Sequence, residues 1–127
     1  MSSKEEKIGD LKLSIANLRD ILNMPAENEI DFIMRDATIK RFELCYDLTW
    51  KCLKHKLAES GVDAQNPRAA YTEAVRNSLL KEDDVWFDII AARNSAVHSY
   101  DTDLANELYK KIPEYMDEFE EVYEVVN

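Results

Sequence analysis

The sequence predicts an all-α protein: an up-and-down antiparallel helical bundle of four long helices plus a shorter one. The 127 residues include only 2 glycines and 3 prolines, which is few for a chain rich in strands and turns. Apolar residues recur at spacings of three and four along most of the chain. This is the period of an amphipathic helix, and no segment alternates as a strand would. At this length we expect one domain, residues 1–127, with its own core.

Two apolar stripes predict the first two helices. The first covers Ile8–Leu22 and ends before Pro25, which cannot continue a helix. The second predicts a helix of about thirty residues, near Ile30–Ser60, with Gly61 as a left-handed stop. Its stripe consists of Ile39, Phe42, Tyr46, Trp50, Leu53 and Leu57.

Capping residues mark the next two helices. Asn66 as N-cap and Pro67 at the first helical position begin a third helix, which we expect to reach about Leu80. Asp83 or Asp84 can cap a fourth. The stripe of the fourth helix consists of Trp86, Ile89, Ile90, Arg93, Val97 and Tyr100.

A fifth helix is predicted after His98. Asp101, Thr102 or Asp103 can start it, and Pro113 should kink or restart it because proline removes one intrahelical hydrogen bond. Its inner face is expected to consist of Leu104, Leu108, Ile112, Tyr115, Phe119 and Val122.

The chain is strongly acidic, with a formal net charge of −10. This charge argues against a general nucleic-acid-binding surface, because phosphate contacts need clustered lysines and arginines. The charge is uneven, however: residues 101–127 carry nine acids and two bases, whereas residues 35–56 carry six bases and three acids. That basic strip could hold a phosphate chain or a nucleotide, although ordinary ion pairs explain each charge taken singly. Its bases are Arg35, Lys40, Arg41, Lys51, Lys54 and Lys56.

The sequence also indicates a cellular location. No apolar run approaches the length of a membrane span, and the start, MSSKEEKIGD, has no signal-peptide core. Cys45 and Cys52 lie about two turns apart on one predicted helix, too far apart to form a disulfide. We therefore expect a cytoplasmic chain with reduced thiols and no membrane partner.

The stretch RNSAVHSY, residues 93–100, places an arginine, a histidine and a tyrosine close together. Arg93 lies on an apolar stripe, where a charged group must be paired or must face a cleft. Arg93 and His98 are about 140° apart around a helix, so one unbroken helix cannot point both at one target. Their convergence requires the helix to loosen near His98, or a second copy of the chain to complete the site.

These two residue types suit metal-independent RNA cleavage. Imidazole exchanges protons near neutral pH, so His98 can serve as general acid or base. Guanidinium can steady a pentavalent phosphate formed by attack of a ribose 2′-hydroxyl. The spacing alone is weak evidence, because Arg93 could instead pair with Glu43 or Asp47, and His98 could bind carbonyls at the helix end.

Two motifs resemble a known family. RNSAVHSY resembles the R-x4-H-x-Y signature of HEPN domains, in which an arginine, a polar residue and a histidine form a ribonuclease site across a dimer interface. IKRFELCYDLTWKCLK, residues 39–54, is similar to an element of the bacterial nucleotidyltransferase substrate-binding family, a HEPN branch that includes HepT-like toxins. Lys40 and Asp47 stand where that element has Gln and Glu. The similarity covers roughly residues 5–125.

The resemblance implies a homodimer and a partner encoded nearby, a minimal nucleotidyltransferase. In one implied role the chain is an RNase toxin with Arg93, Asn94 and His98 as catalytic residues. The partner would neutralise it by adding AMP to Tyr100. In the other role the chain is a non-catalytic subunit that presents a substrate to the nucleotidyltransferase. We place the toxin role ahead, with RNA or a nucleotide as the expected ligand.

Glu43, Asp47 and Lys51 are expected to support the site, Glu43 by orienting the Arg93 guanidinium. A third hypothesis, a purely structural interaction module, would make Arg93 and His98 dispensable.

Cys52 and His55 share a helical face and could offer two metal ligands. No second Cys/His pair completes a zinc tetrahedron, so we expect no metal site and no cofactor.

Overall fold

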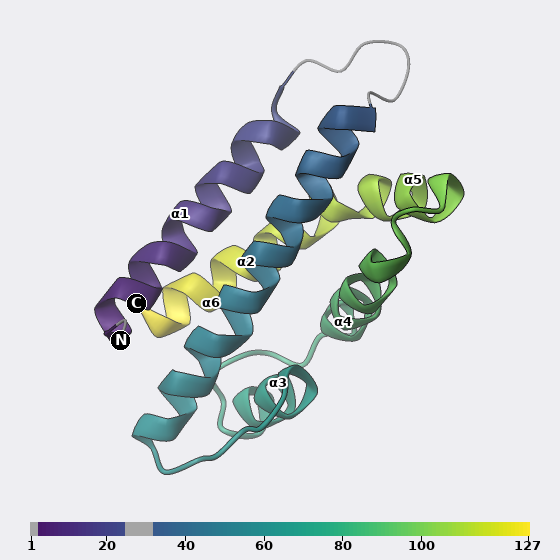
Figure 1. Cartoon of the computed structure of the whole chain (residues 1–127). Helices are drawn as coiled ribbons and strands as arrows, with labels where there is room; N and C mark the ends of the chain where they lie inside the picture. The colour runs from purple at the N-terminus through teal and green to yellow at the C-terminus, as the bar shows by residue number, and fades with distance from the viewer. Residues whose placement is uncertain (1–2, 25–31) are drawn as a thin grey trace.

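The computed structural model describes residues 3–24 and 32–127, and these residues form the all-α bundle that the sequence predicts. α1 (Lys4–Leu22) and α2 (Phe32–Glu59) are antiparallel, and α6 (Met116–Val126) contacts both (Figure 1). α2 is the central helix, because it also contacts α3 and α5. The remaining elements are α3 (Pro67–Arg76), α4 (Val85–Ser95), η1 (Ala96–His98), α5 (Thr102–Lys111) and η2 (Ile112–Tyr115), where η marks a 3₁₀ turn.

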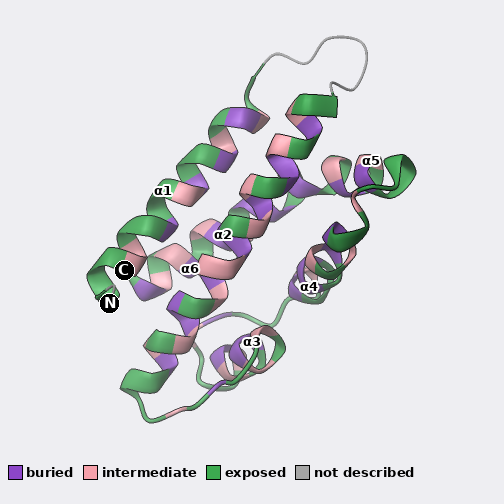
Figure 2. Cartoon of the chain, viewed as in Figure 1, coloured by how far each residue is buried: buried purple, intermediate pink, exposed green. Residues whose placement is uncertain are grey.

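The core is built around Phe42 of α2. Its ring lies 6.0 Å from the ring of Tyr115 and 6.1 Å from that of Phe119, between centroids. Trp86 of α4 meets Phe119 edge-on at 6.1 Å and stacks on Tyr71 of α3 at 3.8 Å. These contacts fix α3 and α4 to the long helices, and Figure 2 shows buried residues, in purple, spread over the helices. Trp86 is thus the core anchor that its stripe predicts.

Several helix ends lie where the sequence places them. The Asn66 side chain accepts from the Ala69 N–H at 2.9 Å, and Pro67 occupies the first helical position of α3. The Asp83 carboxylate accepts from the Val85 N–H at 3.0 Å at the start of α4. Gly61 has φ +78°, the left-handed conformation that ends α2. The predicted end at Pro25 and start near Ile30 lie outside the described residues.

The third and fourth helices are shorter than predicted. α3 ends at Arg76 and does not reach Leu80, because Ser78 adopts φ +61° and turns the chain. The Leu79 N–H then donates back to the Ala74 carbonyl at 2.8 Å. α4 ends at Ser95, so Tyr100 is not part of it.

The predicted fifth helix is interrupted at Pro113, where η2 separates α5 from α6. This agrees with the predicted kink or restart, since Pro113 cannot donate an intrahelical hydrogen bond. Three predicted inward positions are wrong. Val97 and Tyr100 follow the end of α4 and are 65% and 84% exposed, and Leu104 near the start of α5 is 41% exposed.

Cys45 and Cys52 are both buried, and no disulfide joins them. None of the described helices is both long enough and apolar enough to cross a membrane.

Candidate functional site

Arg93 extends from α4 toward α2, where two carboxylates face it. Its Nη2 lies 3.9 Å from Glu43 Oε2, and its Nε lies 3.8 Å from Asp47 Oδ1. Glu43 and Asp47 are one turn apart on α2, so they share a side of the helix. The structure therefore brings together three of the residues predicted for the site.

Among the described residues, the Arg93 guanidinium lies near two opposite charges but makes no hydrogen bond. Its Nε is buried and has no hydrogen-bond partner in that part of the chain, because 3.8 Å to Asp47 exceeds the length of an N–H···O bond, about 3.2 Å at most. A buried donor without an acceptor costs about 1–3 kcal/mol. One quarter of the side chain remains exposed (25%). A phosphate entering from that side would supply acceptors in the bidentate geometry that guanidinium favours.

Tyr46 completes the surroundings of Arg93, although its stripe predicted only a core position. Burial raises the pKa of the Tyr46 phenol to about 12, and the positive charge of Arg93 offsets part of that rise. The phenol is therefore neutral near pH 7 and remains a hydrogen-bond donor. Its position in the sequence, directly before Asp47 and three residues after Glu43, is the feature that could have indicated its closeness to Arg93.

The helix loosens between Arg93 and His98, as their spacing requires for convergence. The regular turns of α4 stop at Ser95, and residues 96–98 form the tighter η1 turn. The His98 carbonyl then accepts from the Asp101 N–H at 2.9 Å, which turns the chain toward α5. Nevertheless, no hydrogen bond or ring contact joins Arg93 and His98 among the described residues; Arg93 faces α2 and His98 is exposed.

The other predicted residues of this stretch are open to solvent. Asn94 is exposed on α4, and Tyr100 is 84% exposed after η1. The rings of His98 and Tyr100 lie 6.0 Å apart, between centroids, in an edge-to-face arrangement. Any group added to the Tyr100 hydroxyl would therefore lie close to the His98 imidazole.

One face of α2 carries the basic residues nearest to Arg93. Positions 40, 43, 47, 51 and 54 follow each other at spacings of three and four, so their side chains share that face. Lys40 and Lys51 are exposed and Lys54 is half-buried. Lys51, predicted as a supporting residue, thus lies one turn beyond Asp47 on the Arg93 side.

The other half of the predicted basic strip faces elsewhere. Arg35 is 6% exposed and donates to Asn106 of α5 at 3.0 Å. Arg41 donates to the Asn17 carbonyl of α1 at 2.7 Å, and Lys56 pairs with Glu59 at 3.7 Å. The expectation of one strip of six bases is therefore wrong, because a helix spreads consecutive charges around its circumference.

Metal ligation has no support in the part of the chain that the structure describes. No group of three or more His, Cys, Asp or Glu residues is arranged there to hold a metal ion. The His55 Nε2 instead lies 3.1 Å from the Lys7 Nζ. What Arg93, Asn94 and His98 can offer is an anion contact, an amide donor and a proton carrier.

Residues 6–127 match the family described as nucleotidyltransferase substrate binding protein like. The chain belongs to this family. The resemblance seen in the two sequence motifs is thereby confirmed. No similar sequence was found among curated proteins.

Solved structures of other proteins share the family's fold. A protein from Thermus thermophilus is 24% identical, with 92% of this chain and 98% of the other covered and a TM-score of 0.82. HI0074 from Haemophilus influenzae, described as the fold of a substrate binding domain of a nucleotidyltransferase, is 20% identical. The match covers 94% of this chain and 98% of HI0074, with a TM-score of 0.81.

A third neighbour is the tri-AMPylated HEPN toxin of Shewanella oneidensis in complex with MNT antitoxin. It is 20% identical, with 99% of this chain and 98% of the toxin chain covered and a TM-score of 0.75. All three proteins are similar to this chain in fold.

Proposed function

We propose that this chain is a HEPN-type RNase toxin that works as a homodimer and cleaves RNA without a metal ion. We further propose that a minimal nucleotidyltransferase neutralises it by AMP transfer to Tyr100. The observation that carries the proposal is the state of Arg93: two carboxylates orient it, its Nε has no acceptor, and its side chain is still partly open. A guanidinium held in this way is suited to a phosphate.

The proposed cleavage is an internal transfer. The ribose 2′-oxygen attacks the adjacent phosphorus, the bond from phosphorus to the 5′-oxygen breaks, and the ends are a 2′,3′-cyclic phosphate and a 5′-hydroxyl. Arg93 stabilises the charge on the pentavalent phosphate, and Asn94 donates to a phosphate oxygen. His98 accepts the 2′-hydroxyl proton in one copy, and His98 of a second copy protonates the 5′-oxygen.

The homodimer is supported by the surface around η1. Phe87 of α4 and Val97 of η1 are 46% and 65% exposed. Large apolar side chains left exposed on one part of the surface can mark an interface. A second copy against α4 would cover them and bring its own His98 to the opening beside Arg93, which one chain alone does not do.

AMP transfer to Tyr100 is a balanced step with a nucleoside triphosphate as donor. The Tyr100 oxygen attacks the α-phosphorus of ATP, the bond to the β-phosphate bridge breaks, and pyrophosphate leaves while the phenol proton is lost. Tyr100 is accessible at 84% exposure. The added phosphodiester brings a negative charge beside His98, whose ring is 6.0 Å away, and would repel RNA from the site.

A second candidate is the non-catalytic subunit that presents a substrate to a nucleotidyltransferase. The net charge of −10 favours it, because an acidic surface binds RNA poorly outside a narrow basic groove. In that case the Arg93 site would hold a phosphate of the presented substrate without cleaving it.

The test is RNA cleavage in EDTA by the unmodified wild type, by His98→Ala and by His55→Ala. The chain has only 2 histidines, so His55→Ala, on the surface of α2, is a matched control. We expect cleavage by the wild type and by His55→Ala, and a loss of at least about a hundredfold in His98→Ala. Absence of cleavage by wild-type protein of the correct unmodified mass would favour the second candidate.

A further inference from the structure

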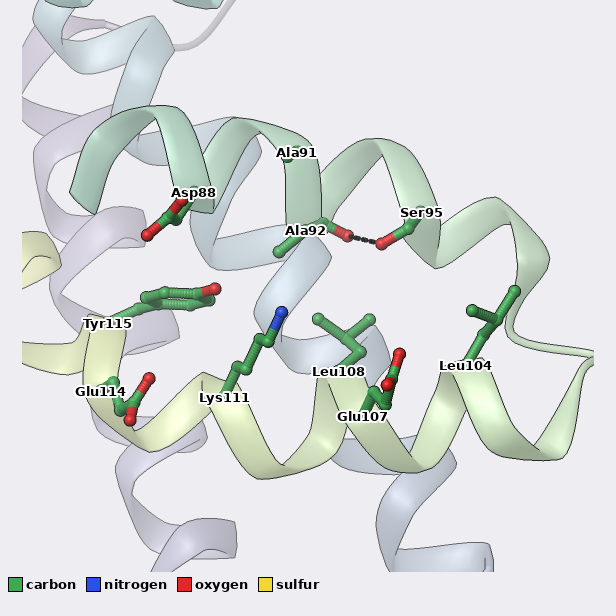
Figure 3. Close-up of a pocket in the computed structure, with 10 residues that line it drawn as sticks. All are labelled: Asp88, Ala91, Ala92, Ser95, Leu104, Glu107, Leu108, Lys111, Glu114 and Tyr115. Atoms are coloured by element: carbon green, nitrogen blue, oxygen red, sulfur yellow. Dashed lines mark hydrogen bonds between the residues drawn. The ribbon is translucent and has the colours of Figure 1, made fainter. Parts of the chain in front are cut away.

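A groove lies between α4 and α5, next to the η1 turn that follows α4. It encloses about 380 Å³ and is lined by residues of both helices and of η2 (Figure 3). Ser95 and Leu104 line the end where the chain passes through η1 from α4 to α5. That connection carries Tyr100, so the groove begins next to the residue proposed for modification.

The groove is negatively charged and its charges are unpaired. Asp88 of α4, Glu107 of α5 and Glu114 of η2 line it together with one cation, Lys111. None of these four side chains has a salt-bridge partner among the described residues. Figure 3 shows Lys111 reaching from α5 toward α4, between Tyr115 and Leu108. The formal charge of the lining is therefore −2.

A tyrosine of the core also lines the groove. Tyr115 is 3% exposed, yet it lines the groove, and its hydroxyl makes no hydrogen bond with any other described residue. Burial raises the pKa of the Tyr115 phenol, and the charges of Asp88 and Glu114 raise it further. The phenol therefore stays neutral, and an incoming side chain would find both a hydrogen-bonding group and a negative potential there.

We infer that this groove is the docking site for a basic segment of the nucleotidyltransferase that modifies Tyr100. This inference rests on the proposed function. An enzyme whose active site meets the Tyr100 hydroxyl must lie against the surface around it, and the groove is the adjoining concave surface. Its carboxylates are exposed and would attract a partner that brings lysine or arginine side chains, while Leu104 and Leu108 offer apolar contact. Charges of this kind set the affinity for the partner and the orientation of docking.

The first test neutralises the groove without altering its shape. The triple variant Asp88→Asn, Glu107→Gln, Glu114→Gln is compared with Asp117→Asn, Glu121→Gln, Glu124→Gln, which makes the same charge change on the exposed side of α6. The readouts are affinity for the purified nucleotidyltransferase partner and AMP transfer to Tyr100 by intact mass. We expect the groove triple to raise KM for this chain about tenfold with kcat unchanged, and the control to change KM by less than about twofold.

The second test makes the groove more negative, so partner binding should become tighter. Lys111→Gln removes the cation of the groove, so we expect it to tighten partner binding about two- to fivefold. Lys110→Gln, a neighbour that does not line the groove, should leave binding unchanged. Equal behaviour of the groove and control triples, or of Lys111→Gln and Lys110→Gln, would overturn the docking inference. A wild type that binds the partner through the groove but is never modified would contradict the proposed function and leave the docking site in place.

Discussion

Arg35 and Arg93 both have little exposed surface, but their guanidinium groups differ in how well they are hydrogen-bonded. The Arg35 Nε donates to Asp36 at 3.0 Å, its Nη1 donates to Asn106 at 3.0 Å, and its guanidinium lies 4.7 Å from the centre of the Phe32 ring. Arg93 has carboxylates only at 3.8 and 3.9 Å, and its buried Nε has no hydrogen bond. The first arginine joins α2 to α5, whereas the second is oriented but unsatisfied.

The difference teaches how to separate structural from functional charge in a helical bundle. Both arginines look alike in the sequence, because each lies on a helix among apolar residues. A buried cation that stabilises the fold must have its donors satisfied within the fold. A cation with a buried donor that has no acceptor raises the free energy of the folded state, and a ligand that supplies an acceptor lowers it again.

The largest effect is expected for Arg93→Gln. We expect RNA cleavage to fall at least about a hundredfold, because the phosphate loses its cationic contact in the transition state. The free energy of unfolding should change by less than about 1 kcal/mol, because Arg93 makes no short hydrogen bond. Cleavage assays and urea unfolding on the same protein sample measure both. A stability loss that accounts for the lost cleavage would make Arg93 structural.

The reverse result is expected for Arg35→Gln. Its hydrogen bonds to Asp36 and Asn106 and its contact with Phe32 are lost, which should lower the free energy of unfolding by about 2 kcal/mol. Cleavage per folded molecule should stay within about twofold. Arg41→Gln is the control, because its surface bond to the Asn17 carbonyl should cost less than about 1 kcal/mol. If Arg35→Gln lowered the free energy of unfolding no more than Arg41→Gln does, Arg35 would not be a structural arginine and the difference from Arg93 would not hold.

Glu118 is a useful contrast with Arg93, because its buried Oε2 also has no hydrogen-bond partner among the described residues. Burial, followed by a hydrogen bond with Asp83 and the charges of Asp83, Glu121 and Asp117, raises the pKa of Glu118 to about 7. Below that pKa the Glu118 carboxyl carries its own proton, so one of its oxygens is a donor and needs no donor from a neighbour. An unsatisfied buried oxygen can therefore report protonation and not a ligand site.

The raised pKa of Glu118 predicts how the stability of the fold changes with pH. The folded chain holds the Glu118 proton more tightly than the unfolded chain. The stabilisation is therefore complete below the ordinary pKa of about 4.5 and is lost as the pH rises through about 7. After allowance for solvent screening, we expect a decrease of about 1–2 kcal/mol between pH 5 and pH 8. Urea unfolding measures it, and Glu118→Gln should lack this component. An identical pH dependence in both proteins would refute the raised pKa of Glu118.

The smallest effect is expected for Tyr71→Phe. The Tyr71 hydroxyl is buried without a partner, and burial raises the pKa of its phenol well above 10. Phenylalanine keeps the stack on Trp86, with ring centroids 3.8 Å apart in the wild type. Removing the hydroxyl should leave the free energy of unfolding unchanged or raise it by up to about 1 kcal/mol. If thermal unfolding instead showed a decrease in stability of more than about 1 kcal/mol, the Tyr71 hydroxyl would have a hydrogen-bond partner in solution.

Local signals in the sequence predicted the fold well. Asn66, Asp101 and Gly61 mark helix ends through their own backbone chemistry, and Pro113 interrupts a helix wherever it stands. The early end of α3 at Arg76 could not be predicted in this way, because it depends on Ser78 adopting the left-handed conformation. That conformation goes with the hydrogen bond from the Leu79 N–H back to the Ala74 carbonyl, which the pattern of side chains does not reveal.

The candidate site was predicted in composition but not in arrangement. Spacing placed Glu43 and Asp47 on one side of α2, yet it could not show that both stop short of hydrogen-bonding Arg93. Counting charges along the chain grouped Arg35 and Arg41 with Lys51, although they face different neighbours. These properties depend on distances between helices, which no single helical pattern contains.

The most direct test is the chemistry of the ends left in RNA cut by unmodified protein in EDTA, with His98→Ala prepared in parallel. Cleavage through Arg93 and His98 predicts 2′,3′-cyclic phosphate and 5′-hydroxyl ends that are absent with the variant, and no cutting where the 2′-hydroxyl is replaced by hydrogen. Ends with a 3′-hydroxyl and a 5′-phosphate, or equal cutting by His98→Ala, would contradict it.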